Sequence, residues 1–159
     1  MKVEQMMNHA VKACHPEDSL NKAAQTMWEN VCGAVPIVDS EFKPIGFLTD
    51  RDICMAAYTQ GKPLQALTVD GAMARNVVCC QLEDDLDSAM QLMREKHFRR
   101  LPVVGPDGKL IGILSLDDLA HEAGLSLRGG VNRELRERVA EVCIAVSRSR
   151  VFARSPRTE

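Results

Sequence analysis

Hydrophobic residues recur at the spacing of an α-helix in two segments of the chain. In the first segment they are Leu20, Ala23, Ala24, Met27 and Val31, and in the second they are Leu86, Ala89, Met90 and Met93. Residues that favour a helix N-terminus precede both segments, at Asp18-Ser19 and Asp84-Asp85. Each segment is therefore predicted to form an amphipathic helix of about three turns.

Two short apolar runs follow each predicted helix. They are residues 34–38 and 45–48 in one half of the chain, and residues 101–104 and 111–114 in the other. Turn residues separate the two runs, which predicts two strands joined by a hairpin. Thr49 in one half and Ser115 in the other then open a further segment, which is predicted to be a second helix. Each half is therefore predicted to be a β-α-β-β-α unit of about 50 residues.

Each half has a proline inside the first of its two predicted strands, Pro36 in one and Pro102 in the other. Proline has no backbone N–H group and cannot donate to a sheet ladder. We therefore expect both prolines where the backbone is not fully paired, such as a sheet edge or a strand end that faces a ligand.

The two halves are copies of one unit. Sliding the chain by 66 residues aligns 3–53 with 69–119 without a gap, and 18 of these 51 positions are identical. One such unit has a single sheet with one covered face, so two units stacked about a pseudo-two-fold axis would bury their remaining apolar faces. The predicted fold class is therefore α+β, with repeat 1 at residues 1–62 and repeat 2 at residues 63–123.

A different kind of segment occupies residues 124–159. After a linker that begins at residue 124 and ends at Gly129-Gly130, with Asn132 as the expected cap, apolar residues recur at helical spacing: Val131, Leu135, Val139, Val142 and Val146. This predicts an amphipathic helix of about four turns, followed by a flexible basic tail from Arg150 to Glu159. The helix either packs on the module or on a second chain, or serves as a docking element for a partner.

Composition narrows the classes of partner. Aromatic residues make up only 4% of the chain, which is too few for the stacking surfaces that bind single-stranded nucleic acid. Residues 122–159 carry eight Arg, but five Glu are interspersed among them, so nucleic-acid binding is not favoured. No apolar run approaches the ~18 residues that a membrane span requires. We expect no membrane association.

The cysteines and histidines do not indicate a metal site. The six Cys include no C-x-x-C pair, the four His are scattered, and the N-terminus has no apolar signal segment. We expect a reducing, cytoplasmic location, with the Cys acting as small buried hydrophobic residues. The chain also lacks a Walker loop and any His/Ser/Asp or Cys/His constellation, so it is predicted not to be an enzyme and to have no catalytic residues or cofactor.

The candidate chemistry lies where the second strand of each unit meets the following helix. Both copies have a hydroxyl residue followed three positions later by a carboxylate, Thr49 with Asp52 and Ser115 with Asp118. One interpretation is a capping box, although Glu or Gln is usual at its last position. The other is a ligand site, because a helix N-terminus attracts phosphate and a carboxylate can accept both hydroxyls of a ribose. Asp is shorter than Glu, which favours a ligand at the helix mouth over a closed capping box.

These motifs resemble the CBS (cystathionine-β-synthase-type) domain family. The run from Gly33 to Asp39, followed by Gly46 to Asp52, looks like the adenosine-binding signature of that family, and Arg99 to Val104 with Gly112 to Asp118 is similar to repeats in the γ subunits of AMP-activated kinases. The resemblance covers residues 3 to about 123 and implies a tandem CBS pair, or Bateman module. It implies adenine contacts near Val35, Pro36 and Ile37 in repeat 1, and near Leu101, Pro102 and Val103 in repeat 2.

The two copies differ in charge where ligand phosphates are expected. Arg99 and Arg100 stand where repeat 1 has Gly33 and Ala34, and Arg51 stands where repeat 2 has Asp117. In the family, residues at the positions of Arg99 and Arg100 contact ligand phosphates. The alternative is that each of these arginines is an ordinary surface charge exposed to water. We expect Thr49 and Asp52 to hold the ribose, with Arg51, Arg99 and Arg100 available for phosphates. Asp117 would repel phosphates from the Ser115/Asp118 site, making it the weaker one.

The resemblance implies a regulatory module that binds an adenosyl ligand such as AMP, ADP or ATP and transmits it as a conformational or assembly change. The alternative is a non-catalytic dimeric scaffold with vacant clefts. The family commonly pairs its modules into flat dimers, so a homodimer through exposed helices is expected. Because no output domain is attached, the regulated activity would belong to another protein.

Overall fold

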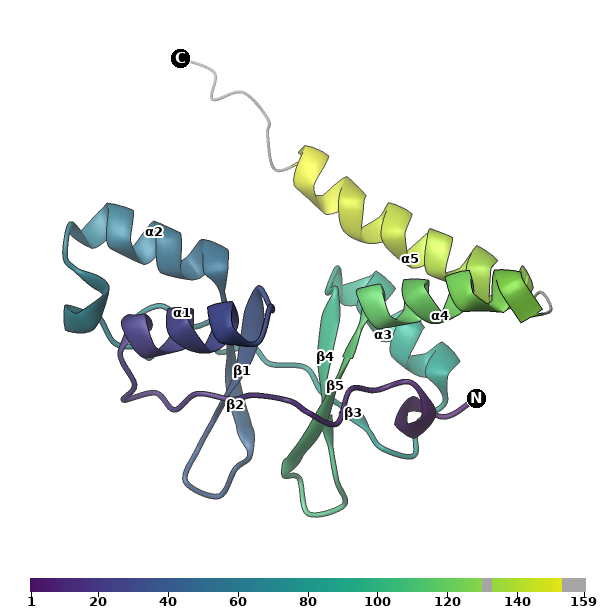
Figure 1. The fold of residues 1–159 in the computed structure, drawn as a ribbon, viewed down its shortest axis with the longest axis horizontal. Coiled ribbons are helices and arrows are strands. Elements are labelled where there is room, and N and C mark those ends of the chain that lie inside the picture. Colours follow the sequence, from purple (N-terminus) through teal and green to yellow (C-terminus); the bar gives the residue numbers. More distant parts are fainter. Residues whose placement is uncertain (130–132, 153–159) are drawn as a thin grey trace. The chain divides into compact units, whose positions relative to one another are not determined.

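A computed structural model describes the backbone of residues 1–129 and 133–152, and the side chains of residues 1–124 and 133–147. Its elements in chain order are η1 (Val3–Gln5), α1 (Leu20–Glu29), β1 (Ala34–Val38), β2 (Pro44–Thr49), α2 (Asp50–Gln60), η2 (Leu64–Ala66), β3 (Cys80–Gln81), α3 (Leu86–Lys96), β4 (Arg100–Val104), β5 (Leu110–Ser115), α4 (Leu116–Gly129) and α5 (Arg133–Phe152) (Figure 1). Each half contains a helix, two strands and a further helix in the predicted order, which confirms the fold class.

The sheet of repeat 1 consists of β1 and β2, which pair antiparallel from Ala34↔Thr49 to Val38↔Pro44. The first strand of the predicted unit is reduced to an isolated parallel bridge between Cys14 and Ile37. On that side of β1 the carbonyl of Pro36 accepts from the N–H of Cys14 at 3.1 Å. The missing donor of Pro36 therefore faces an almost unpaired side of the strand, which confirms the expectation for this proline.

Repeat 2 carries a sheet with strand order β3-β4-β5. Its first strand, β3, begins at Cys80, the residue that lies 66 positions after Cys14. The thiol of Cys80 also donates to the carbonyl of Pro102 at 3.8 Å. The same segment thus opens both repeats, as a two-residue strand in one and a bridge in the other.

The chain divides into two compact units that exchange their first segments. Unit 1 contains Met1–Asn8 together with Cys80–Val103 and Ile113–Glu159, and unit 2 contains His9–Cys79 with Val104–Gly112. In unit 1 the N–H of Val3 donates to the carbonyl of Asp84 at 3.0 Å. In unit 2 the N–H of Val69 donates to the carbonyl of Asp18 at 2.9 Å. The two bonds are related by the 66-residue repeat. The first segment of repeat 1 therefore belongs to the unit that contains most of repeat 2, and the first segment of repeat 2 belongs to the unit that contains most of repeat 1.

The core of unit 2 is aliphatic, as the composition predicts. Buried side chains come from both helices, both strands and the exchanged segment: Leu20, Ala23, Met27, Val35, Ile37, Leu48, Ile53, Ala56, Leu67, Val69 and Met73 form one cluster with Cys14. In unit 1 the corresponding positions Val3, Leu86, Met93, Leu101 and Leu114 are almost fully buried. Burial of these side chains provides the main driving force for each unit.

The start of α1 is held by its predicted cap. The hydroxyl of Ser19 accepts from the N–H of Lys22 at 3.2 Å. The adjacent carboxylate of Asp18 accepts from the N–H of His15 at 2.8 Å and from the Lys22 ammonium at 2.7 Å. Burial acts to raise the pKa of Asp18, but these two hydrogen bonds and the charge of Lys22 outweigh it, so the pKa is lowered overall.

The end of α1 differs from the prediction. Val31 was expected on the apolar face of the helix, but α1 ends at Glu29, and Val31 adopts a left-handed conformation with φ 51°. Its side chain is 95% exposed. His97, at the same position of repeat 2, is also left-handed, with φ 57°. A shared backbone turn after the first helix therefore overrides the apolar character of Val31.

The C-terminal helices are longer than the sequence pattern predicts. Residues 124–129, expected as a linker, continue α4, which is anchored by the buried side chain of Ala123. α5 extends to Phe152, so residues 150–152 of the expected flexible tail are helical. Val131, Asn132 and residues 153–159 lie outside the described residues.

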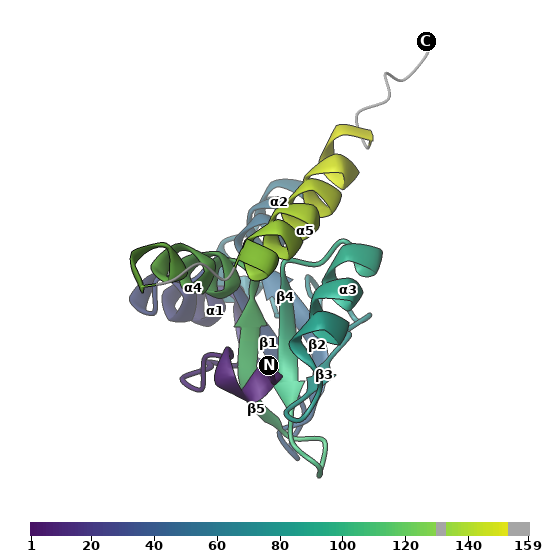
Figure 2. The same cartoon turned by 90° about the vertical axis from the view of Figure 1, so that its right-hand side faces the viewer.

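Helix α5 packs within unit 1, against both α3 and α4 (Figure 2). The predicted apolar stripe is buried at its described positions, which are Leu135, Val139, Val142 and Val146. Two ion pairs join α5 to α3, from Arg138 to Asp87 and from Arg94 to Glu141, the latter at 2.9 Å. Packing on the module is thus the role that the described part of this helix has.

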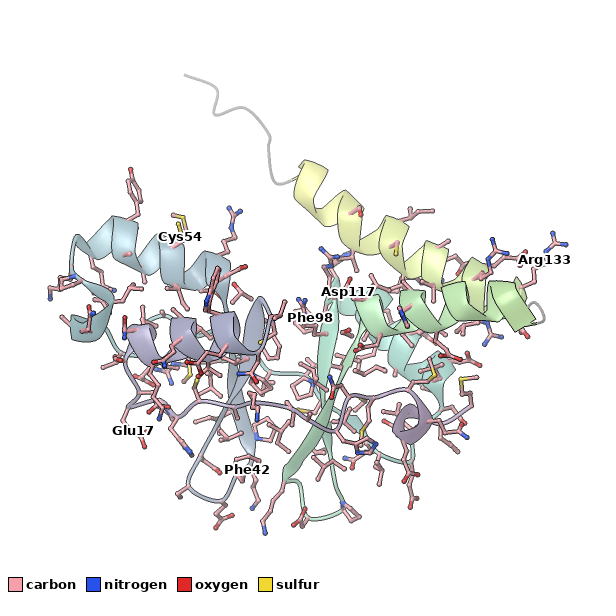
Figure 3. All side chains as sticks on the ribbon, in the orientation of Figure 1. Glu17, Phe42, Cys54, Phe98, Asp117 and Arg133 are labelled. Carbon is pink, nitrogen blue, oxygen red and sulfur yellow. The ribbon has the colours of Figure 1, made fainter. Side chains whose placement is uncertain are left out.

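Two further expectations concern cysteines and membranes. Cys14 and Cys80 are buried, but Cys54 is exposed on α2 (Figure 3), so the expectation of uniformly buried Cys is wrong for this residue. Burial raises the pKa of the Cys14 and Cys79 thiols, which keeps them protonated.

Among the described residues, no helix is both long and apolar enough to span a bilayer.

Candidate functional site

Thr49 and Asp52 form a closed capping box at the N-terminus of α2. The N–H of Asp52 donates to the Thr49 hydroxyl oxygen at 3.2 Å, and the N–H of Thr49 donates to Oδ2 of Asp52 at 2.9 Å. The Thr49 hydroxyl also donates to the same Oδ2 at 2.7 Å. Asp52 therefore closes the box, although its short side chain was expected to favour a ligand over a closed box. The extended backbone of Thr49, with ψ 162°, brings its N–H within reach of the shorter side chain.

Ser115 and Asp118 repeat this arrangement at the N-terminus of α4. The Ser115 hydroxyl donates to Oδ2 of Asp118 at 2.5 Å, and the N–H of Asp118 donates to the Ser115 hydroxyl oxygen at 3.1 Å. Ser115 is buried, whereas Thr49 is half-buried. Both hydroxyl–carboxylate pairs thus cap a helix, and in both the described bonds to the carboxylate end on Oδ2.

The strand residues expected near adenine belong to the core. Val35 and Ile37 in β1, and Leu101 in β4, are almost completely buried, and Pro36 and Pro102 are buried as well. Their side chains therefore serve packing within each unit. A ligand at these strands would meet mainly their backbone groups and the strand ends.

The arginines of repeat 2 do not stand free. Arg99 and Arg100 both face Asp117, with N–O distances of 3.6 and 3.4 Å. Asp117 lies at the start of α4 (Figure 3). The premise that Asp117 is a bare negative charge beside the Ser115/Asp118 site is thus wrong, because two cations accompany one acid. Arg51, at the corresponding position of repeat 1, is exposed on α2.

The structure brings the predicted site residues together in two sets, one in each unit. Unit 2 holds Val35, Pro36, Ile37, Thr49, Arg51 and Asp52, and unit 1 holds Arg99, Arg100, Leu101, Pro102, Ser115 and Asp118. Each set has a hydroxyl, a carboxylate and at least one arginine at the N-terminus of a helix. That combination suits recognition of a ribose and an anionic group.

The sequence pattern does not reveal one backbone link in each repeat. It joins the start of α2 to the residue before β1, and the start of α4 to the residue before β4. The N–H of Asp50 donates to the carbonyl of Gly33 at 3.1 Å, and the N–H of Leu116 donates to the carbonyl of Arg99 at 2.9 Å. This backbone bond fixes the helix N-terminus against the strand start in both repeats. It involves no side chain, so no residue pattern reveals it. Among the described residues, His, Cys, Asp and Glu form no group of three that could hold a metal ion.

Comparison with known proteins agrees with the repeat and the fold. The family model for the CBS domain matches residues 3–58 and 69–124. The CBS domain-containing protein YhcV of Bacillus subtilis is 35% identical over 118 residues, covering 74% of this chain and 82% of that protein. An uncharacterized protein of Methanopyrus kandleri is 34% identical over 104 residues, covering 65% of this chain but only 53% of that protein.

A solved structure gives the same result. It is a CBS domain pair in complex with 5'-methylthioadenosine and S-adenosyl-L-methionine. This chain matches it with a TM-score of 0.70 at 25% identity, covering 79% of this chain and 98% of that chain. Two family matches at the spacing of the internal repeat, together with this fold, show that the chain belongs to the CBS domain family and carries two CBS domains in tandem.

Proposed function

We propose that the chain is a regulatory module that binds an adenosyl ligand and is not itself catalytic. The observation that carries this proposal is the doubled helix N-terminus at which a hydroxyl, a carboxylate and arginine gather, at Thr49/Asp52 and at Ser115/Asp118. It is supported by the related CBS pair that was solved with two adenosyl ligands. AMP, ADP, ATP and S-adenosylmethionine are the ligands to compare.

Capping and ligand binding are compatible at these carboxylates. An ionised carboxylate offers about four acceptor positions on its two oxygens. The described hydrogen bonds to Asp52 all end on Oδ2, which leaves Oδ1 as the atom to accept a ribose hydroxyl. The ligand therefore binds without opening the capping box, and α2 stays intact.

The charges support different ligands at the two sites. At repeat 2 a ligand phosphate would compete with Asp117 for Arg99 and Arg100, so the less charged adenosyl ligands fit there best. At repeat 1 the exposed Arg51 lies one residue before Asp52 and offers a planar fork for phosphate. We therefore propose repeat 1 as the stronger site for nucleotides because Arg51, unlike Arg99 and Arg100, is in no ion pair among the described residues.

The proposal is tested by calorimetry with AMP and with S-adenosylmethionine. Asp52→Asn keeps a side-chain oxygen for the cap but removes the charge that strengthens a bond to ribose, so affinity for AMP is expected to fall at least about ten-fold. Thr49→Ser keeps the hydroxyl and serves as the control, with affinity within about two-fold of the parent. Asp118→Asn is expected to affect S-adenosylmethionine more than AMP.

Two outcomes would contradict the proposal. If Asp118→Asn abolishes AMP binding while Asp52→Asn leaves it intact, the ranking of the sites is wrong. A thermal-shift panel addresses the broader alternative, because a ligand at 100 times its dissociation constant stabilises a protein by about 2.7 kcal/mol. No shift with any adenosyl ligand would favour a non-catalytic scaffold. Self-association into a homodimer remains a prediction, which sedimentation velocity measures.

A further inference from the structure

Helix α5 reaches the candidate site of repeat 2. A cavity of about 140 Å³ lies there, and its described lining consists of Arg99 and Leu116 together with Cys143, Val146 and Ser147 of α5. Arg99 directly precedes β4, and Leu116 is the first residue of α4. Helix α5 is therefore next to the point at which a strand and a helix of this site begin.

The two residues on the site side of this cavity are joined by a backbone bond. The N–H of Leu116 donates to the carbonyl of Arg99 at 2.9 Å. Leu116 is only 4% exposed, and its neighbours along the chain are the capping residue Ser115 and the acid Asp117. The guanidinium of Arg99 faces the carboxylate of Asp117 at 3.6 Å. Helix α5 thus lies against the bond that positions the start of α4.

A second contact restrains the residues before β4. The ring nitrogen Nδ1 of His97 lies 3.2 Å from the carbonyl of Ala145 in α5. A carbonyl oxygen only accepts, so this ring nitrogen is the donor. His97 has a left-handed backbone, with φ 57°, at the end of α3. Helix α5 therefore holds both the turn that leads into β4 and the residue that opens α4.

The attachment of α5 is uneven along its length. Ion pairs join it to α3 from Arg138 to Asp87 and from Glu141 to Arg94, and the adjacent Val142 is 2% exposed. Farther along the helix, on the side of the site, contact is made around the cavity. Side chains around a cavity have fewer packing partners than they have in a filled interior. The site end of α5 is therefore the end whose docking a ligand is able to strengthen.

Repeat 1 lacks the residues that meet α5 in repeat 2. Gly33 stands in place of Arg99, and Asp50 stands in place of Leu116. Gly33 offers no side chain, and the carboxylate of Asp50 would be costly to bury against an apolar residue such as Val146. All of α5 belongs to unit 1, whereas the hydroxyl–carboxylate pair of repeat 1 belongs to unit 2. An effect of α5 on ligand binding is thus expected at repeat 2 alone.

We propose that α5 transmits the binding of an adenosyl ligand at repeat 2, an inference that rests on the function proposed above. The ligand needs Ser115, Asp118 and the neighbouring arginines held at an ordered helix start. Undocking of α5 exposes Leu116 to water and releases Arg99, so binding has to order the helix start again. Docked α5 therefore strengthens ligand binding, and by linkage the bound ligand tightens the docking of α5 by the same factor.

The first experiment follows the docking of α5 in the full chain. Cys143 is partly buried and lines the cavity, so a thiol reagent labels it faster when α5 undocks. Its labelling, measured by mass spectrometry of its peptide, is expected to slow at least about five-fold at saturating S-adenosylmethionine. Asp118→Asn is expected to remove this response. Asp52→Asn, the matched change at repeat 1, is expected to keep it.

A matched pair of variants separates docking from charge. Val146→Lys places an ammonium group at a 6% exposed position beside Arg99, which disfavours the docking of α5. Affinity for S-adenosylmethionine, measured by calorimetry, is then expected to fall at least about five-fold. Ile144→Lys adds the same charge at a 54% exposed position of α5, and its affinity is expected to stay within about two-fold of the parent. Affinity for AMP at repeat 1 is expected to be unchanged in both variants.

The possible failures are distinguishable. If the parent binds no adenosyl ligand, the proposed function is wrong and this inference falls with it. If S-adenosylmethionine binds through Asp118 but the labelling of Cys143 does not change, the inference alone is wrong. Equal affinity of Val146→Lys and Ile144→Lys for S-adenosylmethionine would also overturn it. So would an equal loss of AMP and S-adenosylmethionine affinity in Val146→Lys, because this would show a general effect on the fold.

Discussion

At the scale of single residues, Asp18 and Asp84 show how one side chain holds a loop in both repeats. Each carboxylate accepts from the backbone N–H three residues earlier, His15 in one case and Gln81 in the other, and both distances are 2.8 Å. Asp18 gains an ion pair with Lys22 as well. These bonds fix the approach of the chain to α1 and α3, and they require an ionised side chain.

The lowered pKa of Asp18 makes stability depend on pH. A group whose pKa is lower in the folded state contributes stability above its unfolded pKa, and this contribution is lost as the pH falls through the folded pKa. Asp18→Asn is therefore expected to cost about 1.5 kcal/mol at neutral pH, with the difference from the parent shrinking as the pH falls below the ordinary Asp pKa of about 3.9.

Urea denaturation at a series of pH values measures the effect of Asp18→Asn. Glu83→Gln removes an exposed carboxylate and is the control, with little change at any pH. A deficit for Asp18→Asn that stays constant down to acid pH would show that the charge does not matter.

Residue patterns predict contacts unevenly. The hydroxyl–carboxylate pairs were found from spacing because both partners lie within one turn of each other. The ion pairs of Arg99 and Arg100 with Asp117 were not found from spacing, because they join the start of a strand to a helix that lies 17 or more residues away. Val31 was misplaced for a different reason, since periodicity registers hydrophobicity but not the left-handed turn that ends α1.

At the scale of elements, α5 is bound to unit 1 by one face only. Val142 on that face is almost fully buried, whereas Ile144, two residues later, is half exposed. Val142→Ala is expected to destabilise the protein by about 1–3 kcal/mol through the cavity it leaves. The exposed control Ile144→Ala is expected to change stability by less than about 0.5 kcal/mol.

Undocking of α5 can be followed at Cys143, which is partly buried and lines a cavity with Arg99 and Leu116. Val142→Ala is expected to speed the labelling of this thiol, measured by mass spectrometry of its peptide. Unchanged labelling combined with lowered stability would mean that α5 unfolds only together with the rest of unit 1.

Elements with strong periodicity or a proline-marked strand were predicted almost to the residue. The hairpin strands β1, β2, β4 and β5 match their apolar runs within one or two residues. The first strand of each repeat was not located, because a bridge at Cys14 or a two-residue strand at Cys80 leaves no alternating pattern to detect. The length of α4 was underestimated because the expected linker begins at Gly124, a residue that is unfavourable inside a helix, yet α4 continues through it to Gly129.

At the scale of the whole molecule, the exchange of first segments predicts crossed effects of mutation. Val3 and Val69 occupy the same position of the two copies, and both are 0% exposed. Val3→Ala is expected to weaken unit 1, where it packs with the elements of repeat 2, by about 1–3 kcal/mol. Val69→Ala is expected to weaken unit 2 by a similar amount.

Hydrogen exchange distinguishes the two units. With Val3→Ala, amides of α3 and β4 should lose protection while those of α1 and β1 keep it, and Val69→Ala should give the reverse. Each valine substitution also serves as the control for the other. Loss of protection in the repeat that directly follows the mutated residue, rather than in the other one, would contradict the crossed arrangement.

The exchanged segments also impose an order on synthesis. Val3 emerges from the ribosome 81 residues before Asp84, whose carbonyl accepts its N–H. At about 5–20 residues per second, this interval is on the order of 4–16 s. The β1–β2 hairpin, by contrast, has both of its strands within residues 34–49. Unit 2 is therefore able to fold while unit 1 is still being made, and the first segment of the chain is among the last to find its place.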